Sequence, residues 1–267
     1  MSERFDRRSR RRGALVVVGT GITGIGQTTL ETVACLERAD KVFFLVAEPT
    51  TELWIRGLNP SAESLAGLYA DHKNREQTYA EITRRLVSAV RGGARVCAAF
   101  YGHPGVLVQA SHRAIRILKR DRFSARMLPG VSADGCLYAD LGVNPGDHGV
   151  QSFEATDFLL YRRRFDPTSE LLLWQVGVLG EPRAIKGVTC RPERLRTLVN
   201  VLRRSYPGAH RVTLYYAPMF PSQPPIVTRL RLDRLPQVPV SPLALLYVPA
   251  LPQREADPKI AAWFDEK

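Results

Sequence analysis

A glycine-rich turn near the start of the chain has the spacing of a phosphate-binding loop. Gly19–Gly24 fits G-x-G-x-x-G, and it lies between an apolar run and a helical pattern. Such glycines let the backbone approach a phosphate at a helix N-terminus. A dinucleotide site also needs an acidic residue after the second strand, but the candidate, Glu48, precedes a proline and lies beyond the usual spacing of about 20 residues. A dinucleotide site and a tight strand-to-helix turn beside a cleft both remain open.

A second turn combines an aromatic, a histidine and two glycines. Phe100–Val106 reads Phe-Tyr-Gly-His-Pro-Gly-Val directly after an apolar run. Pro104 suits the first position of a helix. Open α/β sheets bind ligands at the carboxyl ends of their strands. Tyr101 and His103 are therefore expected to lie where a ligand binds, although a lone histidine is more often structural.

The elements that must position these turns alternate between strand and helix in the first half of the chain. Helical spacing is clearest over 71–91, where Tyr79, Ile82, Leu86 and Val90 fall close to one face. The predicted strands are 14–19, 41–47, 95–100 and 125–128, and the predicted helices are 27–38, 71–91, 106–118 and 132–141. This alternation predicts an α/β fold with a parallel sheet and helices on both faces.

A second domain is expected after the Pro/Gly-rich stretch at 142–149. Beyond it, strands are predicted at 171–178, 211–216 and 243–248, with a helix at 192–205. Proline density rises after Pro218, which favours long loops or antiparallel edge strands. The predicted organisation is a basic tail (1–13), an N-terminal α/β domain (14–145), a C-terminal α/β domain (146–252) and a short tail (253–267).

Composition points to a soluble, reduced protein with a basic surface. No apolar run reaches about 18 residues, and the N-terminus lacks the apolar segment of a secretory signal, so a cytoplasmic location without a membrane span is expected. The four cysteines lie far apart and form no Cys-x-x-Cys pair, so no metal site is expected. The formal charge is +12, of which +4 comes from the first twelve residues. That charge makes an acidic partner plausible. The basic tail itself is interpreted first as a solubilising leader.

Three motifs occur in an order that resembles a known superfamily. They are Val-Val-Gly-Thr-Gly-Ile at 17–22, Phe-Tyr-Gly-His-Pro-Gly-Val at 100–106 and Leu-Pro-Gly-Val-Ser-Ala at 128–133. The resemblance is to the tetrapyrrole (precorrin and porphyrin) methylases, and it covers roughly residues 15–249. It implies two α/β domains with S-adenosyl-L-methionine in the cleft between them, and S-adenosyl-L-homocysteine as the product. It also implies that the first glycine turn borders the substrate side.

Longer matches resemble one branch, the borosin peptide α-N-methyltransferases. They are Leu-Tyr-Ala-Asp-His-Lys-Asn-Arg-Glu-Gln-Thr-Tyr at 68–79, the stretch at 129–142, Gln-Ser-Phe-Glu-Ala-Thr-Asp at 151–157 and Trp-Gln-Val-Gly at 174–177. This resemblance implies methylation of backbone amides in a ribosomal peptide. Fungal members carry a further tyrosine three residues before the one matched by Tyr69. Ala66 stands at that position here, so the proton relay is expected to differ.

The resemblance places catalytic roles on Tyr69, Arg75, Tyr79 and Tyr101. An amide nitrogen is a poor nucleophile because its lone pair is delocalised into the carbonyl. Arg75 and Tyr79 are four residues apart and share one helix face. The guanidinium can hold the amide oxygen as negative charge develops. It can also lower the pKa of a neighbouring phenol, so that a tyrosinate acts as base. Tyr101 could supply a second phenol. The structural alternative is a core tyrosine beside a surface ion pair of Arg75 with Glu76 or Asp71.

The same matching implies which residues contact the cofactor. These positions come from five separate stretches of the chain. They are Tyr101, His103, Val106, Ser132, Ala133, Gln175, Tyr215, Ala244 and Leu245.

The expected substrate is a separate precursor peptide. Residues 256–267 match poorly to a Val/Ile/Gly-rich core peptide, which favours a substrate supplied in trans, as in split bacterial members. A leader helix on that peptide, acidic to suit the basic surface, would dock on the enzyme. By the resemblance, a homodimer forming a heterotetramer with two peptides is expected. No membrane or nucleic-acid partner is expected.

Three alternatives remain open. The first is a tetrapyrrole C-methyltransferase acting on a precorrin or uroporphyrinogen, with several basic residues in the cleft for the substrate carboxylates. The second is an NAD(P)-dependent oxidoreductase, as the glycine pattern permits. The third is a basic nucleic-acid-binding protein, as the charge and the arginine tail permit.

Overall fold

The computed structural model describes residues 13–183, 190–220, 222–253 and 255–265, and the chain forms two compact units. The first unit runs to Asp140 and includes short segments near 181 and 217, and the second begins at Leu141. The predicted arginine tail, apart from Gly13, and the end of the chain at Lys267 lie outside the described residues.

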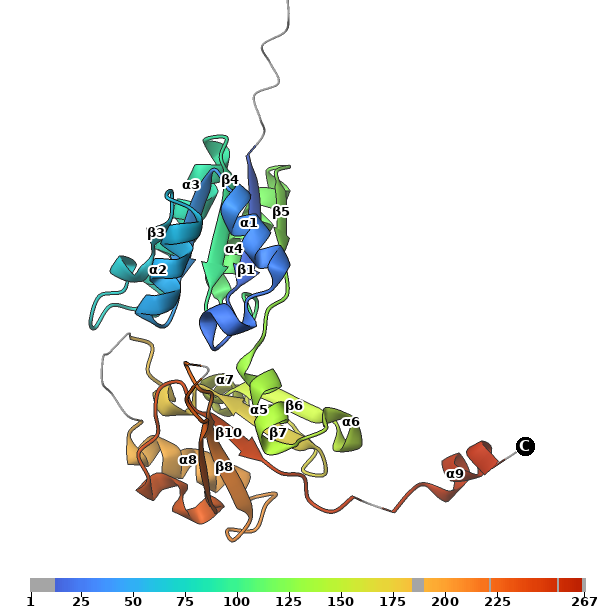
Figure 1. Cartoon of the computed structure of the whole chain (residues 1–267). Coiled ribbons are helices and arrows are strands. Elements are labelled where there is room, and N and C mark those ends of the chain that lie inside the picture. Colours follow the sequence, from blue (N-terminus) through green and yellow to red (C-terminus); the bar gives the residue numbers. More distant parts are fainter. Residues whose placement is uncertain (1–12, 184–189, 221, 254, 266–267) are drawn as a thin grey trace, which may run out of the picture. The chain divides into compact units, whose positions relative to one another are not determined.

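The first unit contains a parallel five-stranded sheet in the order β3-β2-β4-β1-β5 (Figure 1). Its strands are β1 (Ala14–Gly19), β2 (Lys41–Leu45), β3 (Glu63–Ser64), β4 (Arg95–Phe100) and β5 (Ser124–Met127). Strands β1 and β4 pair over their whole length, from Ala14 opposite Arg95 to Gly19 opposite Phe100. The glycine turn and the Tyr101 turn therefore leave the sheet at the same edge.

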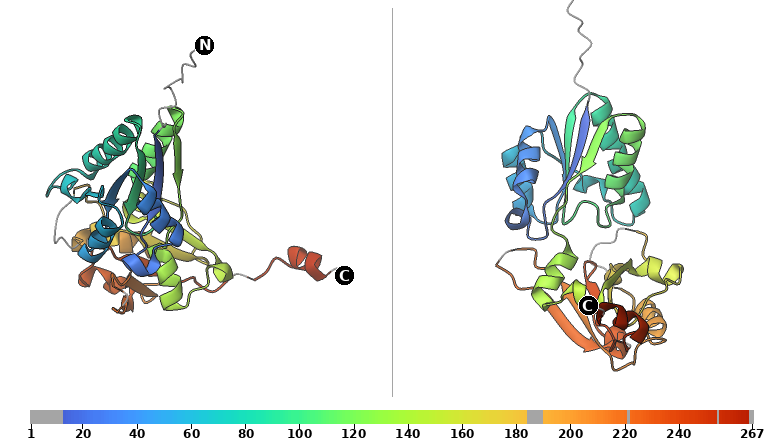
Figure 2. Two further views of the ribbon diagram at one scale, coloured as in Figure 1. Left: turned by 45° about the horizontal axis from the view of Figure 1, so that its top comes forward. Right: turned by 90° about the vertical axis from the view of Figure 1, so that its right-hand side faces the viewer.

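Helices cover both faces of this sheet, as Figure 2 shows for the first unit. The helices are α1 (Leu30–Arg38), α2 (Pro49–Leu58), α3 (Arg75–Arg91) and α4 (Gln109–Arg120). Alternate strand residues enter two cores, because successive side chains of a strand point to opposite faces. Ile82, Leu86 and Leu118 from α3 and α4 belong to one core, and Leu36 and Ile55 from α1 and α2 belong to the other.

The second unit contains a mixed sheet in the order β6-β7-β10-β8-β9. Its strands are β6 (Val150–Glu154), β7 (Glu170–Trp174), β8 (Arg211–Tyr216), β9 (Ile226–Arg231) and β10 (Leu245–Val248). Only β6 and β7 pair in parallel, and the other three pairings are antiparallel. Strand β9, after the proline-rich stretch, is the antiparallel edge strand that the sequence favours.

Three helices and two 3-10 turns accompany the strands of the second unit. They are α6 (Pro145–His148), α7 (Ala155–Leu160), α8 (Pro192–Leu202), η3 (Val176–Val178) and η4 (Leu232–Gln237). Leu195, Leu198 and Leu202 of α8 pack in one core with Leu171 and Leu173 of β7. Helix α8 thus covers one face of the sheet.

Several predicted boundaries are wrong for local reasons. The helix predicted from Gln27 begins at Leu30, because Gly24–Gln27 (η1) forms a 3-10 turn first. The helix predicted from Val106 begins at Gln109. The strand predicted to reach Val178 ends at Trp174, because Gln175 adopts a left-handed conformation with φ 58°. Such a residue cannot continue a strand.

The remaining helices lie after the first sheet and near the end of the chain. Helix α5 (Ala133–Leu141) follows β5, and α9 (Pro258–Asp265) follows the last strand. The sequence predicted α5 but not α9. No helix among the described residues is long and apolar enough to cross a bilayer.

Candidate active site

Three glycine turns approach one another at the carboxyl edge of the first sheet. A Cβ atom on Gly19 would overlap the carbonyl oxygen of Gly102 and lie 2.8 Å from Pro104 Cδ. A Cβ atom on Gly130 would lie 3.0 Å from the same carbonyl oxygen and 3.1 Å from Gly19 Cα. The Gly102 amide also donates to the Gly21 carbonyl at 2.9 Å. The three motifs thus form one structure, and larger side chains would separate its parts.

Tyr101, His103 and Val106 lie in this structure, directly after β4. The Tyr101 amide donates to the carbonyl of Leu45 at the end of β2, at 2.9 Å. His103 Nδ1 accepts from the Gly105 amide at 3.0 Å, which fixes the ring against its own turn. Val106 closes that turn by donating its amide to the His103 carbonyl at 3.1 Å. The backbone therefore holds all three residues in place at the strand ends.

Ser132 and Ala133 lie where α5 begins. The Ser132 carbonyl accepts from the Cys136 amide at 3.1 Å and so starts the helix. Gln27 links this helix to the first glycine turn, because its Nε2 atom lies 3.5 Å from Cys136 Sγ. Its Oε1 accepts from the Ile22 amide at 2.7 Å. Five predicted cofactor-contacting residues thus gather at one edge of the first unit.

Glu48 caps a helix. Its carboxylate accepts from the amides of Thr50 at 2.6 Å and Thr51 at 2.8 Å, at the start of α2. Burial raises the pKa of Glu48, but the hydrogen bonds from Thr51 and Thr50 outweigh burial and leave that pKa below its usual value. Since a Cβ atom on Gly24 would lie 3.0 Å from this carboxylate, the glycine turn packs against an acid that is already committed to the protein. This arrangement suits the strand-to-helix turn better than the dinucleotide site.

Tyr69, Arg75 and Tyr79 come together around the start of α3. Asn74 caps this helix, accepting from the Glu76 amide at 2.8 Å, and Arg75 is its first residue. Tyr69 and Tyr79 are both partly buried against the core beneath α3 and α4. Three of the four predicted catalytic residues thus belong to one cluster, while Tyr101 follows β4.

The linker before α3 is held by its own polar contacts. The Leu68 carbonyl accepts from Lys73 Nζ at 2.8 Å, and Thr78 Oγ1 lies 3.5 Å from the same oxygen. Lys73 also pairs with Glu81 at 2.6 Å. These contacts tie the residue before Tyr69 to the first turns of the helix.

The electrostatic effects within this cluster have opposite signs. Burial raises the pKa of Tyr69 to about 12; Tyr79 adds to this rise, and Arg75 opposes it. Burial also raises the pKa of Tyr79, against the lowering effect of Arg75. Arg75 thus lowers both phenol pKa values, as expected. The expectation of a lowered pKa is nevertheless wrong, because burial raises both values by more than Arg75 lowers them. Both phenols are protonated and neutral near pH 7.

Arg75 forms no ion pair with the described residues, whereas its neighbour Glu76 does. Glu76 accepts from Arg113 of α4 through both carboxylate oxygens, one of them 3.0 Å from Nη2. This bond lowers the pKa of Glu76 and raises that of Arg113. Arg113 also lowers the pKa of Tyr79. Arg113 was not predicted from the sequence, because no local pattern links residues 37 positions apart.

Four further predicted residues gather within the second unit. Gln175 follows β7 and Tyr215 lies in β8, while Ala244 directly precedes β10 and Leu245 is its first residue. Leu245 stands opposite Tyr215 in the β8–β10 register. Both side chains are buried, on the face away from the α8 core. A Cβ atom on Gly177 would overlap the Ser241 carbonyl, so the segments carrying Gln175 and Ala244 approach each other closely.

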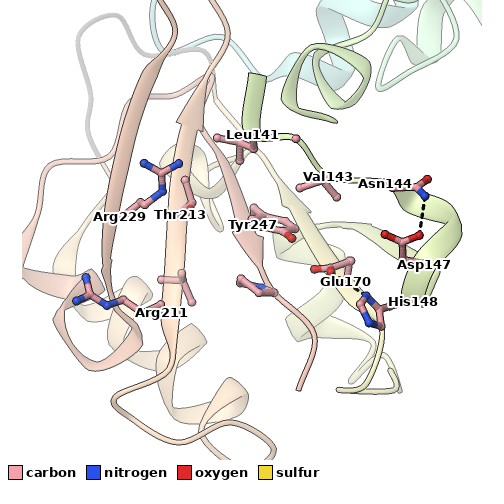
Figure 3. A pocket seen from close by; sticks show the side chains of 13 residues that line it. Leu141, Val143, Asn144, Asp147, His148, Glu170, Arg211, Thr213, Arg229 and Tyr247 are labelled. Atoms are coloured by element: carbon pink, nitrogen blue, oxygen red, sulfur yellow. Dashed lines mark hydrogen bonds and ion pairs between the residues drawn. The ribbon is translucent and has the colours of Figure 1, made fainter. Parts of the chain in front are cut away.

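A separate cavity of about 370 Å³ lies within the second unit (Figure 3). Arg211 and Arg229 enter it from β8 and β9, and Asn144, Asp147 and His148 enter it from α6. None of the predicted site residues lines it. Among the described residues, no cluster of histidine, cysteine or carboxylate side chains could hold a metal ion.

Residues 14–230 match the family described as Tetrapyrrole (Corrin/Porphyrin) Methylases, and the chain belongs to this family of methyltransferases. S-adenosyl-L-methionine is the usual methyl donor in such enzymes. The fold agrees, since the uroporphyrin-III-C-methyltransferase of Thermus thermophilus superposes with a TM-score of 0.64 at 21% identity. That comparison covers 91% of this chain and 99% of the other. The family and the two-domain α/β fold expected from the motifs are thus confirmed.

Within the family, the chain is similar to fungal proteins that combine an enzyme with a peptide precursor. A Coprinopsis marcescibilis protein is 40% identical over 84% of this chain and is named a methyltransferase and type I borosin cyclic peptide precursor. A protein of Omphalotus olearius, named a methyltransferase and omphalotin A precursor, is 39% identical over 89% of this chain. The matched regions span 57% and 58% of those relatives.

Proposed function

We propose that this chain is an S-adenosyl-L-methionine-dependent methyltransferase that N-methylates backbone amides of a separate ribosomal precursor peptide. The observation that carries the proposal is the cluster of Tyr69, Arg75 and Tyr79, in which a guanidinium without an ion pair among the described residues lies beside two partly buried phenols. Similarity to methyltransferase–precursor proteins supports a peptide as substrate.

Each side chain of the cluster has a task that amide methylation requires. Arg75 donates hydrogen bonds to the amide oxygen and stabilises the negative charge that moves there as the nitrogen loses its proton. A phenolate of Tyr79 or Tyr69 accepts that proton. The cofactor, when bound, supplies an electrophilic methyl group, which the nitrogen takes as the carbon–sulfur bond breaks.

The raised phenol pKa values fit a base for a very weak acid. A phenol with a pKa near 12 is ionised in only a small fraction of molecules at neutral pH. The phenolate, once formed, is a stronger base than one with an ordinary pKa. When a bound amide displaces water from Arg75, the guanidinium interacts more strongly with the negative charge that develops on the amide oxygen as the proton leaves.

The proposed cofactor contacts combine close backbone turns with apolar and aromatic side chains. In the first unit they are Tyr101, His103, Val106, Ser132 and Ala133. In the second unit they are Gln175, Tyr215, Ala244 and Leu245. Gly19, Gly102 and Gly130 pack closely against the protein's own backbone and side chains, which fixes the turns that carry the first group.

The proposal extends to the assembly and its location. The substrate peptide is supplied in trans, and two peptides join a homodimer to form a heterotetramer in the cytoplasm. The formal charge of +12 supports attraction to an acidic peptide.

Mass spectrometry of co-expressed peptide tests the proposed function. The chain is produced with the short open reading frame encoded beside it, and the peptide is then fragmented. Mass gains in methylene steps that map to backbone nitrogens are expected, and Arg75→Ala should strongly reduce them. An unmodified peptide, with turnover of uroporphyrinogen or a precorrin instead, would replace the proposal by the tetrapyrrole alternative. NAD(P) binding without affinity for S-adenosylhomocysteine would replace it by the oxidoreductase.

A further inference from the structure

A basic groove lies between α3 and α4 on the outside of the first unit. It has a volume of about 320 Å³ and is lined by Ala80, Thr83 and Arg84 of α3 and by Arg113, Arg116 and Ile117 of α4. Thr83 is buried and donates its hydroxyl hydrogen to the Tyr79 carbonyl at 2.7 Å. The groove thus has a small, mostly apolar floor between positively charged side chains.

Two arginines of this groove have no direct ion pair among the described residues, although Arg84 helps to lower the pKa of Glu81, whose ion-pair partner is Lys73. Arg113 is occupied by Glu76, but Arg84 and Arg116 are exposed and form no ion pair with the described residues. Helix α4 contains Arg113, Arg116, Lys119 and Arg120 and not one carboxylate. Like charges on one surface repel unless a partner of opposite charge binds. The surface is therefore complementary to an acidic partner.

The lining favours a peptide over a nucleic acid. Proteins that bind single strands stack bases on aromatic rings, and no aromatic side chain lines this groove. Ala80 and Ile117 instead offer apolar contacts that suit the aliphatic face of an amphipathic segment. Carboxylates at the edge of such a segment can pair with the guanidinium groups in bidentate fashion.

The groove begins close to the catalytic cluster. Arg84 follows Tyr79 by five residues on α3, which is about 7.5 Å along the helix axis at 1.5 Å per residue. Arg113 joins the two regions, because it lines the groove and pairs with Glu76 beside Tyr79. A segment bound here would hold the rest of its chain near the cluster at a high effective concentration.

We propose that this groove, with Arg84 and Arg116 as its main contacts, docks an acidic segment of the substrate peptide outside the methylated region. The inference rests on the proposed function and adds a recognition surface to it. Docking at this groove predicts that mutation of its arginines lowers the affinity for the peptide without removing the capacity for methyl transfer.

Fluorescence anisotropy tests the docking with a labelled amphipathic peptide of glutamate, leucine and alanine. The full chain is titrated in low salt. The double variant Arg84→Glu/Arg116→Glu is expected to weaken binding at least about tenfold. The milder Arg84→Gln/Arg116→Gln should weaken it less, and it serves as a second variant should the charge reversal impair folding.

The matched control is Arg211→Glu/Arg229→Glu in the second unit. Those two arginines also line a cavity and lack an ion pair with the described residues, so the change in net charge is the same. The control should bind the peptide as the wild type does. Equal losses in both double variants, no binding by the wild type, or tighter binding of a single-stranded oligonucleotide that displaces the peptide would each overturn the docking proposal.

Methyl transfer separates failure of the docking from failure of the proposed function. The groove variant should bind S-adenosylhomocysteine normally and should still methylate the co-expressed peptide when that peptide is in large excess. A methylated peptide with unchanged affinity in the groove variant would overturn only the docking. A wild-type chain that methylates no peptide would overturn the proposed function.

Discussion

The two units of the chain differ in how they position the residues that are predicted to contact substrate and cofactor. In the first unit, the distinctive groups are the ionisable side chains of Tyr69, Arg75 and Tyr79, which affect one another's pKa values. In the second unit, the candidate residues stand out by backbone geometry, with Gln175 in a left-handed conformation and Gly177 against Ser241. Catalysis is therefore expected to depend on side chains of the first unit. The backbone of the second unit is expected to set the conformation of the segments that carry its predicted cofactor contacts.

The sharpest way to break this comparison is to remove the side chains of the cluster. Arg75→Ala should lower kcat about 10²–10³-fold, because the charge developing on the amide oxygen loses its donor. Tyr79→Phe should lower it by a similar factor. Methylation rates and S-adenosylhomocysteine binding measure both effects. Arg196→Ala and Tyr161→Phe, which change exposed side chains of the second unit, are the controls and should leave the rate unchanged. Loss of cofactor binding in the cluster variants would show that the cluster supports structure instead of chemistry.

A backbone change in the second unit should act on stability. Gly177→Ala places a methyl group into the Ser241 carbonyl and 2.7 Å from the Pro242 nitrogen, which should cost about 1–3 kcal/mol of unfolding free energy. Denaturant unfolding monitors this change. Gly57→Ala is the control, since a Cβ atom there meets nothing within 4 Å. It should stabilise α2 by about 0.5–1 kcal/mol, because alanine favours a helix over glycine. A neutral Gly177→Ala would contradict the tight backbone approach.

The pH dependence distinguishes a phenolate base from a purely positional role of the tyrosines. The pKa of Tyr69 is raised to about 12 and that of Tyr79 is also raised, so the active base is scarce at neutral pH. The methylation rate should rise about tenfold per pH unit from neutral pH toward the phenol pKa. The same raised pKa values link folding to phenol protonation. The resulting contribution to the free energy of unfolding is complete below the ordinary tyrosine pKa near 10, and it is lost as pH rises toward 12. A flat rate profile would contradict the phenolate base.

A smaller effect is expected where a side chain of the first unit serves structure alone. Glu48→Ala removes the cap of α2 and should cost about 1 kcal/mol of stability without changing cofactor affinity. The pKa of Glu48 lies below its usual value, so its contribution is present above that value and is lost as pH falls through the lowered one. Thermal unfolding at neutral and acidic pH measures both. Loss of NAD(P) affinity in this variant would instead restore the dinucleotide interpretation.

The sequence predicted the first unit better than the second for a physical reason. Strands buried on both faces, such as 14–19 and 95–100, are continuous apolar runs and keep their predicted bounds. Strand β6 (Val150–Glu154) and edge strand β9 have few buried residues, so no apolar run marks them. Helix α2 was not predicted because its start depends on capping by Glu48, which the sequence suggested only as the acidic residue of a dinucleotide site.

The candidate site was predictable to the extent that its residues are close in sequence. Tyr69, Arg75 and Tyr79 lie within eleven positions, and helical spacing brings two of them onto one face. Arg113 comes from another helix, and its pairing with Glu76 follows only from the packing of α3 against α4. The sequence also could not show that both phenol pKa values are raised, because the burial that raises them depends on tertiary contacts.

The contacts at the Leu68 carbonyl have a further consequence, for conformational entropy. Lys73 and Thr78 both contact this oxygen and fix the backbone next to Tyr69, whose side chain packs against the core without any ligand. Ordering a rotamer-rich side chain on binding costs about 0.5–1.5 kcal/mol of conformational entropy. Here much of that entropy is already lost when the chain folds. A substrate amide would thus meet a phenol and a guanidinium whose spacing is set by the enzyme, and it would lose mainly its own freedom of motion.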